Sequence, residues 1–169
     1  MSTAAPDELD VVDYIQVTKD SYAQLGYDAY RWADNRDEPA AFVEPAKPLS
    51  ESRVVLVASG GVYSVGDIAF THKDDLTHRE VSMNSPTQDL RVTHFAYDQT
   101  SAKADINSVF PIDPLRRLVE AGELGSVAGV GLTFMGGIYS QRRLNESLIP
   151  ALVDRVHELE ADIALLVPV

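Results

Sequence analysis

The chain has 169 residues, of which 45% are hydrophobic, and this is enough for one compact domain with a buried core. Its formal net charge of −12 would repel phosphate backbones, so no nucleic-acid partner is expected, and no apolar run is long enough to cross a membrane. Residues 1–10 are acidic and lack the basic start of a secretory signal, so we expect a cytoplasmic protein.

The N-terminal part, residues 1–52, is predicted to be a helical arm followed by a connector. Apolar residues recur at helical spacing from Leu9 to Trp32, with Gly26 as a break. This segment is rich in tyrosine, so we interpret it as an aromatic arm that covers a sheet face or a subunit surface. Three prolines between residues 36 and 52 then predict an extended connector.

Residues 53–169 are predicted to form an α/β domain. Apolar runs without alternation are typical of strands that are buried on both faces of a parallel sheet. The expected strands are residues 53–58, 89–95, 126–135 and 163–167, the expected helices are 112–121 and 145–158, and 66–85 is expected to be a long irregular excursion. This alternation predicts a mainly parallel sheet with flanking helices in a three-layer, Rossmann-like arrangement.

A candidate site is expected beyond the carboxyl ends of the predicted strands, where ligands bind in open parallel sheets. Glycine backbone at such an edge would let a small anionic group approach closely. The Ser-Gly-Gly turn lacks the spacing of a dinucleotide or Walker loop, so an ordinary tight turn is the competing interpretation. The candidate substrate-binding residues are Ser59, Gly60, Gly61 and Tyr63 after the first strand, and Met135, Gly136 and Gly137 after the third; Pro168 and Val169 follow the last.

His94 follows a predicted strand and is itself followed by Tyr97 and Asp98. An imidazole, a phenol and a carboxylate therefore emerge together near the expected edge. Histidine can donate or accept a proton near neutral pH, so these three residues are the candidate catalytic groups. The alternative is a histidine that is only hydrogen-bonded to loop backbone.

Two other kinds of site are rejected. The glycines between residues 129 and 137 lie within or just after a strand with no helix directly behind them, unlike a dinucleotide-binding loop, and this disfavours a flavin or nicotinamide enzyme. His72, Asp74, Asp75 and His78 match no metal-binding spacing, so no metal is expected.

The chain also carries a combination of motifs in a specific order: Asp105-Ile106-Asn107, then residues 109–113 (Val-Phe-Pro-Ile-Asp), then residues 134–137 (Phe-Met-Gly-Gly). With the strand and turn at 54–63 and the ending at 164–168, this pattern resembles the selenoprotein B-type subunits of the glycine, sarcosine, betaine and D-proline reductases. The similarity covers about the last two-thirds of the chain.

The resemblance implies reductive cleavage of a C–N bond in a small amine substrate by a selenolate or a thiolate. It also implies a partner subunit that bears a pyruvoyl group, and hence a homo- or hetero-oligomer. His94, Tyr97 and Asp98 would handle protons or orient the substrate, and the glycine-containing turns would shape the pocket.

In that family the selenocysteine or cysteine motif follows the strand that corresponds to residues 163–167. The 169 residues contain no cysteine, so no cofactor residue of this kind is expected within them. We expect the chain to be the portion translated before a selenocysteine codon, with an incomplete α/β domain and no redox step of its own. An engineered fragment and a cysteine-free paralogue are the alternatives. A non-catalytic binding or assembly module, which uses the aromatic arm and an open last strand, is the competing function.

Overall fold

The computed structural model describes residues 13–26, 28–29, 36–39, 43–71, 74–95 and 97–169. It contains two compact units, residues 1–43 and residues 44–169. In chain order the elements are α1 (Tyr14–Gln24), η1 (Leu49–Glu51), β1 (Arg53–Ala58), β2 (Val62–Ser64), β3 (His78–Ser82), η2 (Thr87–Asp89), β4 (Leu90–Val92), α2 (Thr100–Ala104), η3 (Ile106–Ser108), α3 (Ile112–Glu120), β5 (Ser126–Val127), β6 (Val130–Phe134), α4 (Gln141–Arg143), the π-helical turn η4 (Leu144–Leu148), α5 (Ile149–Glu158) and β7 (Ile163–Val167).

The first unit contains the helix α1, within the range predicted for a helical arm. The helix begins where the Asp13 carboxylate accepts the backbone N–H of Gln16 at 3.0 Å, which satisfies one of the donors at the helix start. Most of the aromatic character predicted for the arm falls on Tyr27, Tyr30 and Trp32, and these lie outside the described residues.

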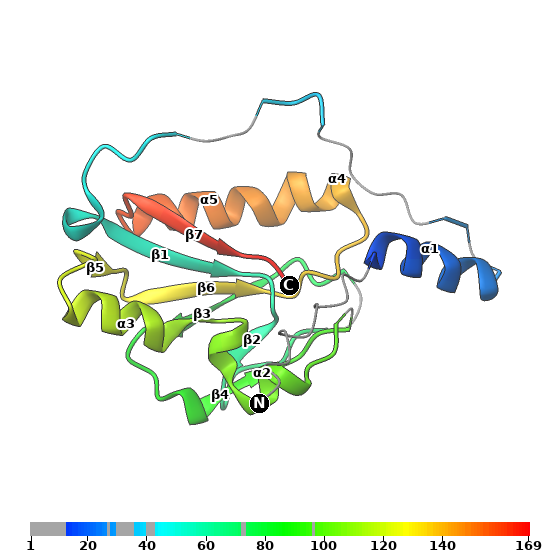
Figure 1. The fold of residues 1–169 in the computed structure, drawn as a ribbon, viewed down its shortest axis with the longest axis horizontal. Coiled ribbons are helices and arrows are strands. Elements are labelled where there is room, and N and C mark those ends of the chain that lie inside the picture. Colours follow the sequence, from blue (N-terminus) through cyan, green and yellow to red (C-terminus); the bar gives the residue numbers. More distant parts are fainter. Residues whose placement is uncertain (1–12, 27, 30–35, 40–42, 72–73, 96) are drawn as a thin grey trace, which may run out of the picture. The chain divides into compact units, whose positions relative to one another are not determined.

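The second unit is built on a mainly parallel sheet, as predicted. β1 lies at its centre, with β5 and β6 on one side and β7 on the other, all parallel to β1 (Figure 1). The segment predicted as one strand over 126–135 is two strands, because an irregularity after Val127 separates β5 from β6. β2 and β4 form a separate two-stranded antiparallel sheet, and β4 is shorter than the predicted strand over 89–95.

The prediction of an irregular segment over 66–85 is wrong at His78–Ser82. These residues form β3, which pairs antiparallel with β6 at the edge of the main sheet. Val81 is the only fully buried side chain of the strand. An edge strand with one buried residue has no apolar run, and this is why its sequence does not reveal it.

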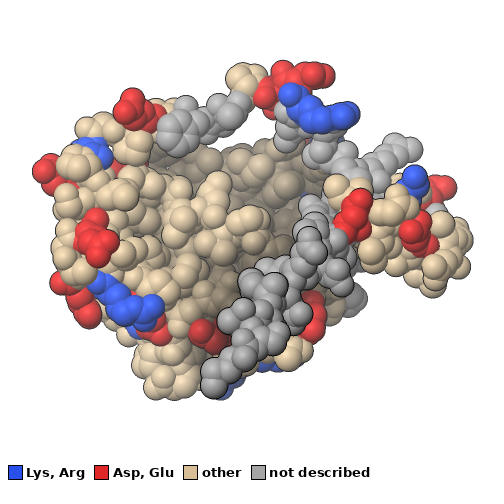
Figure 2. Space-filling view, in the orientation of Figure 1, with Lys and Arg blue, Asp and Glu red and all other residues tan. Residues whose placement is uncertain are grey.

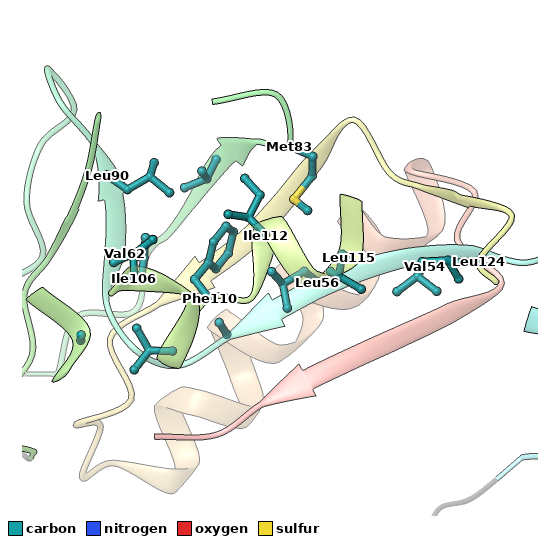
Figure 3. Packing of buried hydrophobic residues seen from close by; sticks show 14 residues of the cluster. Val54, Leu56, Val62, Met83, Leu90, Ile106, Phe110, Ile112, Leu115 and Leu124 are labelled. Atoms are coloured by element: carbon teal, nitrogen blue, oxygen red, sulfur yellow. The ribbon is translucent and has the colours of Figure 1, made fainter. Parts of the chain in front are cut away.

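The central strand separates two hydrophobic clusters because its successive side chains point to opposite faces. Val54, Leu56 and Ala58 pack with the residues of α3 and of the loop before it, among them Phe110 (Figure 3). Val55 and Val57 pack instead with the cluster that contains Leu148 and Leu152 of the C-terminal helix. α3 and α5 therefore lie on opposite faces of the sheet, which makes three layers. The Rossmann-like assignment stays a prediction.

The helix predicted over 145–158 begins earlier, at Gln141, and runs through α4, η4 and α5 to Glu158. Pro150 stands in its middle and has no backbone N–H, so one i→i−4 bond is lost there. The π-helical turn directly before this proline accommodates the missing bond.

β7 is an open edge of the sheet. Among the residues that the structure describes, it pairs only with β1. Leu166 is 68% exposed and Leu165 38% exposed, and Figure 2 shows an uncharged surface over this strand with the charged side chains at its margin. None of the helices in the described part of the chain is long and apolar enough to span a membrane.

Candidate functional site

The carboxyl ends of β1, β6 and β7 meet at one side of the second unit, as the sequence predicts. Each of the latter two strands runs parallel to β1, with Ala58 level with Thr133 on one side and with Val167 on the other. We call the residues that follow these strands, 59–61, 135–137 and 168–169, the strand-end edge.

Ser59 connects all three strand ends. Its backbone N–H donates to the carbonyl oxygen of Val167 at 3.1 Å, and its carbonyl oxygen accepts the N–H of Gly136 at 2.9 Å. Its hydroxyl oxygen accepts the N–H of Val169 at 2.9 Å. Gly60 lies opposite Met135 in an isolated antiparallel bridge. The edge is therefore held together by hydrogen bonds that leave little freedom to the backbone.

Gly61 is required by the fold itself. Its φ of +69° is rare for other residues, and a Cβ at this position would lie 2.0 Å from the carbonyl oxygen of Thr93. Its own N–H and carbonyl bond Phe134 and Thr93, both at 2.9 Å. For this glycine, the interpretation as a tight turn accounts for the residue type without any ligand.

His94 and Tyr97 are carried to the strand-end edge by the loop after β4. The imidazole is buried, and its centroid lies 4.6 Å from that of the Tyr97 ring. The Tyr97 hydroxyl donates to the carbonyl oxygen of Gly60 at 3.0 Å. A Cβ placed on Gly136 would lie 3.3 Å from His94 Nε2 and 3.1 Å from the Ser59 Cβ. Gly136 is therefore packed closely between a hydroxyl-bearing residue and an imidazole.

Burial changes the protonation behaviour of both rings. It lowers the pKa of His94, because the charged imidazolium is poorly solvated there. It raises the pKa of Tyr97 for the corresponding reason. At neutral pH the edge thus presents a neutral imidazole and a protonated phenol. The backbone carbonyl of His94 accepts a hydrogen bond from the Gln99 side chain, which fixes the loop through its main chain.

Three of the predicted site residues have other contacts. Asp98 is exposed, and its carboxylate accepts the N–H and hydroxyl of Thr100 at 2.9 and 2.7 Å at the start of α2; these bonds lower the pKa of Asp98. Met135 is fully buried, and its Sδ accepts the N–H of Gly137 at 3.1 Å. Tyr63 lines a different cavity, between β4 and α2.

Among the four residues considered as a metal site, Asp75 makes hydrogen bonds within the protein instead. His72 lies outside the described residues. Asp75 is buried, and its carboxylate accepts hydrogen bonds from the backbone and hydroxyl groups of Thr71 and Thr77. Burial raises the pKa of Asp75, but these bonds together outweigh it and lower the pKa overall. The described residues include no group of three or more histidines, cysteines and acids that could hold a metal.

Comparison with known proteins identifies the family. The model of the family described as glycine/sarcosine/betaine reductase selenoprotein B matches residues 34–156. The chain belongs to this family.

Two curated members of related complexes are similar to the chain. D-proline reductase subunit gamma of Acetoanaerobium sticklandii is 31% identical over 128 residues, which are 76% of this chain and 53% of that protein. Glycine reductase complex component B subunit gamma of Symbiobacterium thermophilum is 30% identical over 88 residues, which are 49% of this chain and 20% of that protein. The chain spans about half the length of the first relative and a fifth of the second. No solved structure matches it.

The residues that carry the selenoprotein B pattern include a polar network that the sequence analysis missed. The Asn107 side chain donates to Asp105 Oδ1 at 3.0 Å and to Asp113 Oδ2 at 3.1 Å, and it accepts the N–H of Asp113 at 3.0 Å. Arg116 then bonds Asp113 and the carbonyl oxygens of residues 83 and 85. These motif residues fix the turn into α3. The sequence does contain a signal for this network, an Asp two residues before an Asn, because the side chains of both residue types tend to hydrogen-bond nearby backbone groups.

We expect acid to destabilise the chain through His94. Since the folded-state pKa of His94 is lowered, its contribution to stability is complete above about pH 6.5, the ordinary histidine pKa, and is lost as the pH falls through the folded-state value. The measurement is the Tm between about pH 7 and 5, a range above that in which carboxylates titrate.

The variant His94→Gln should show a flatter dependence of Tm on pH than the unmodified chain. His157→Gln, at an exposed position on α5, is the matched control and should keep the original slope. An equal slope in the His94 variant would contradict the expectation.

Proposed function

We propose that this chain is part of a reductase subunit whose complex reductively cleaves a C–N bond of an amino acid or betaine-type substrate. Family membership supports the reductase assignment. The curated relatives are named as a subunit and a component, so we further propose that the chain works in a hetero-oligomer with other reductase subunits.

The arrangement of His94, Ser59 and Gly136 carries the proposal. Because Gly136 has no side chain, its backbone lies directly against Ser59 and against Nε2 of His94 at the strand-end edge. Because no cysteine is present in the 169 residues, the nucleophile comes from outside them. A selenolate or thiolate would supply the attacking atom, and a pyruvoyl group on a partner subunit would hold the amine.

The residues of this chain have separate roles in the proposal. The neutral His94 accepts at Nε2, the atom that faces Gly136, the proton that the selenol or thiol gives up as it becomes the attacking selenolate or thiolate. Tyr97 packs against the imidazole and is anchored on Gly60, so it orients His94. The turns at 59–61 and 135–137 would lie on either side of the substrate. Asp98 acts indirectly, by fixing the start of α2 next to this loop.

The open edge of β7 supports a second candidate function. A strand with exposed leucines, and with one side that no described residue pairs, is suited to pairing with another chain, which favours a non-catalytic binding or assembly role. In that case the strand-end edge would have no part in turnover.

The decisive experiment expresses the chain with the other reductase subunits of its source and supplies a dithiol as the two-electron reductant. Glycine, sarcosine, betaine and D-proline, each labelled with ¹⁵N, are offered separately, and reduced products are identified by mass spectrometry. We expect one of them to be reduced. We also expect His94→Gln to lower turnover by about 100-fold or more, as for loss of a general base, and His157→Gln to have no effect.

The outcomes separate the proposals. An assembled complex that reduces none of the four substrates would contradict the reductase function and leave the assembly role. Turnover that is unchanged in the His94 variant would remove His94 from the mechanism.

A further inference from the structure

A cavity of about 590 Å³ lies between β4, the turn η2 before it and helix α2, away from the strand-end edge. Its size is in the range of small-molecule sites. The apolar part of its lining includes Leu90, Ala102 and Ile106, which belong to the hydrophobic core and so give it a fixed base. Figure 1 shows α2 close to the short strands β2 and β4.

The cavity is lined by two basic side chains, Arg91 and Lys103. Neither lies within ion-pair distance of an acid that the structure describes, whereas Lys47, Arg116 and Arg155 are paired with acids. Lys103 is near enough to Asp98 to contribute to the lowered pKa of that carboxyl. On a chain with a net charge of −12, two such cations at one cavity are unusual and would attract an anion.

Arg91 is also held in place. Its Nη1 donates to the carbonyl oxygens of Gln88 at 2.7 Å and Leu90 at 2.8 Å. Among the described residues, nothing bonds the Nε and Nη2 of Arg91, so both can serve a ligand. A guanidinium that is already fixed loses little freedom on binding a carboxylate. The one acid of the lining, Asp105, already accepts two hydrogen bonds from Asn107.

We propose that this cavity binds a small aliphatic carboxylate, with the carboxylate on Arg91 and Lys103 and the hydrocarbon part over the apolar base. The site rests on the cavity alone and does not depend on the proposed reductase function.

Titration of the ¹⁵N-labelled full chain with hexanoate, followed by NMR, tests the proposal. We expect saturable shifts of the amide signals of residues 88–92 and 102–106 and of the Arg91 Nε–H. Hexylamine and hexan-1-ol have the same number of carbon atoms as hexanoate but no negative charge, so they are expected to cause no saturable shift at these positions.

Substitutions then test whether Arg91 and Lys103 hold the carboxylate. Lys103→Met removes a side chain that makes no hydrogen bond or ion pair with the described residues. The double variant Lys103→Met with Arg91→Gln should weaken hexanoate binding by at least about tenfold, since each positive charge lost weakens the contact with the carboxylate. Arg117→Gln, at an exposed position on α3 outside the cavity, is the matched control and should leave the affinity unchanged.

Two results would overturn the site. One is the absence of saturable shifts up to the solubility of hexanoate, and the other is binding of hexylamine or hexan-1-ol as strong as that of hexanoate. Unchanged affinity in Lys103→Met and in the double variant would equally show that the two cations do not hold the ligand.

Discussion

Gly61→Ala is expected to destabilise the chain by about 2–5 kcal/mol, the combined size of a left-handed backbone penalty and of severe overpacking. The alanine would have to keep a φ of +69°, and its methyl group would lie 2.0 Å from a backbone oxygen of Thr93. Because that oxygen belongs to the segment that leads to His94, the clash would also displace the loop of the candidate site. The measurement is the free energy of unfolding in urea.

Gly122→Ala is the matched control for this variant. Gly122 has nearly the same φ, +72°, but nothing lies within 4 Å of a Cβ built there. It should cost only the backbone penalty of about 1–2 kcal/mol. The difference between the two variants therefore measures the steric contact at Thr93, and equal losses would show that the chain relaxes around the methyl group.

Phe110→Ala is expected to cost about 3–5 kcal/mol, the usual loss for a large aromatic side chain in a core. Phe110 is fully buried in the cluster between the sheet and α3 (Figure 3). Its ring lies against Gly131 of β6, where a Cβ would be 2.7 Å from the ring Cζ and 3.2 Å from Met83 Sδ. The free energy of unfolding again reports the effect.

The close contact makes the pair Phe110 and Gly131 a strong test of packing. Gly131→Ala alone should destabilise by about 1–3 kcal/mol through overpacking. In the Phe110→Ala background the same methyl group would occupy part of the vacated space, so the double variant should lose less than the sum of the single losses. Additive losses would contradict this geometry. Leu118→Ala, at an exposed position on α3, should change stability by no more than about 0.5 kcal/mol.

The parts of the fold that could be predicted are those in which burial leaves a clear pattern. Residues 53–58 lack alternation because they form the central strand β1, which is buried on both faces. Residues 163–167 also lack alternation and form the strand β7, but the expectation that this strand is buried on both faces is wrong, because β7 is an edge strand and none of its residues is fully buried. The amphipathic run at 112–121 gave α3 nearly to the residue. β3 was missed because one face and one edge of it are open, and the single strand over 126–135 was divided by a local irregularity that side-chain types do not signal.

The candidate site was partly predictable for a topological reason. Parallel strands bring their carboxyl ends together, so the meeting of residues 59–61, 135–137 and 168–169 follows from strand order. The positions of His94 and Tyr97 depended in addition on the path of a loop. The Asp98 side chain lies elsewhere because it bonds Thr100 at the start of α2. The Tyr63 side chain lies elsewhere because the pairing of β2 with β4, which are distant in the sequence, places it at another cavity.

The exposed edge strand β7 also affects how readily this protein aggregates. Ile163–Val167 is a five-residue stretch with no charge and no proline, the kind of segment on which fibrils grow when it is left uncovered. Asp162 and Pro168 flank it and act as gatekeepers that limit such growth. We therefore expect part of the chain produced alone to be lost to aggregation, and a lysine in place of Leu166 to improve its recovery in soluble form.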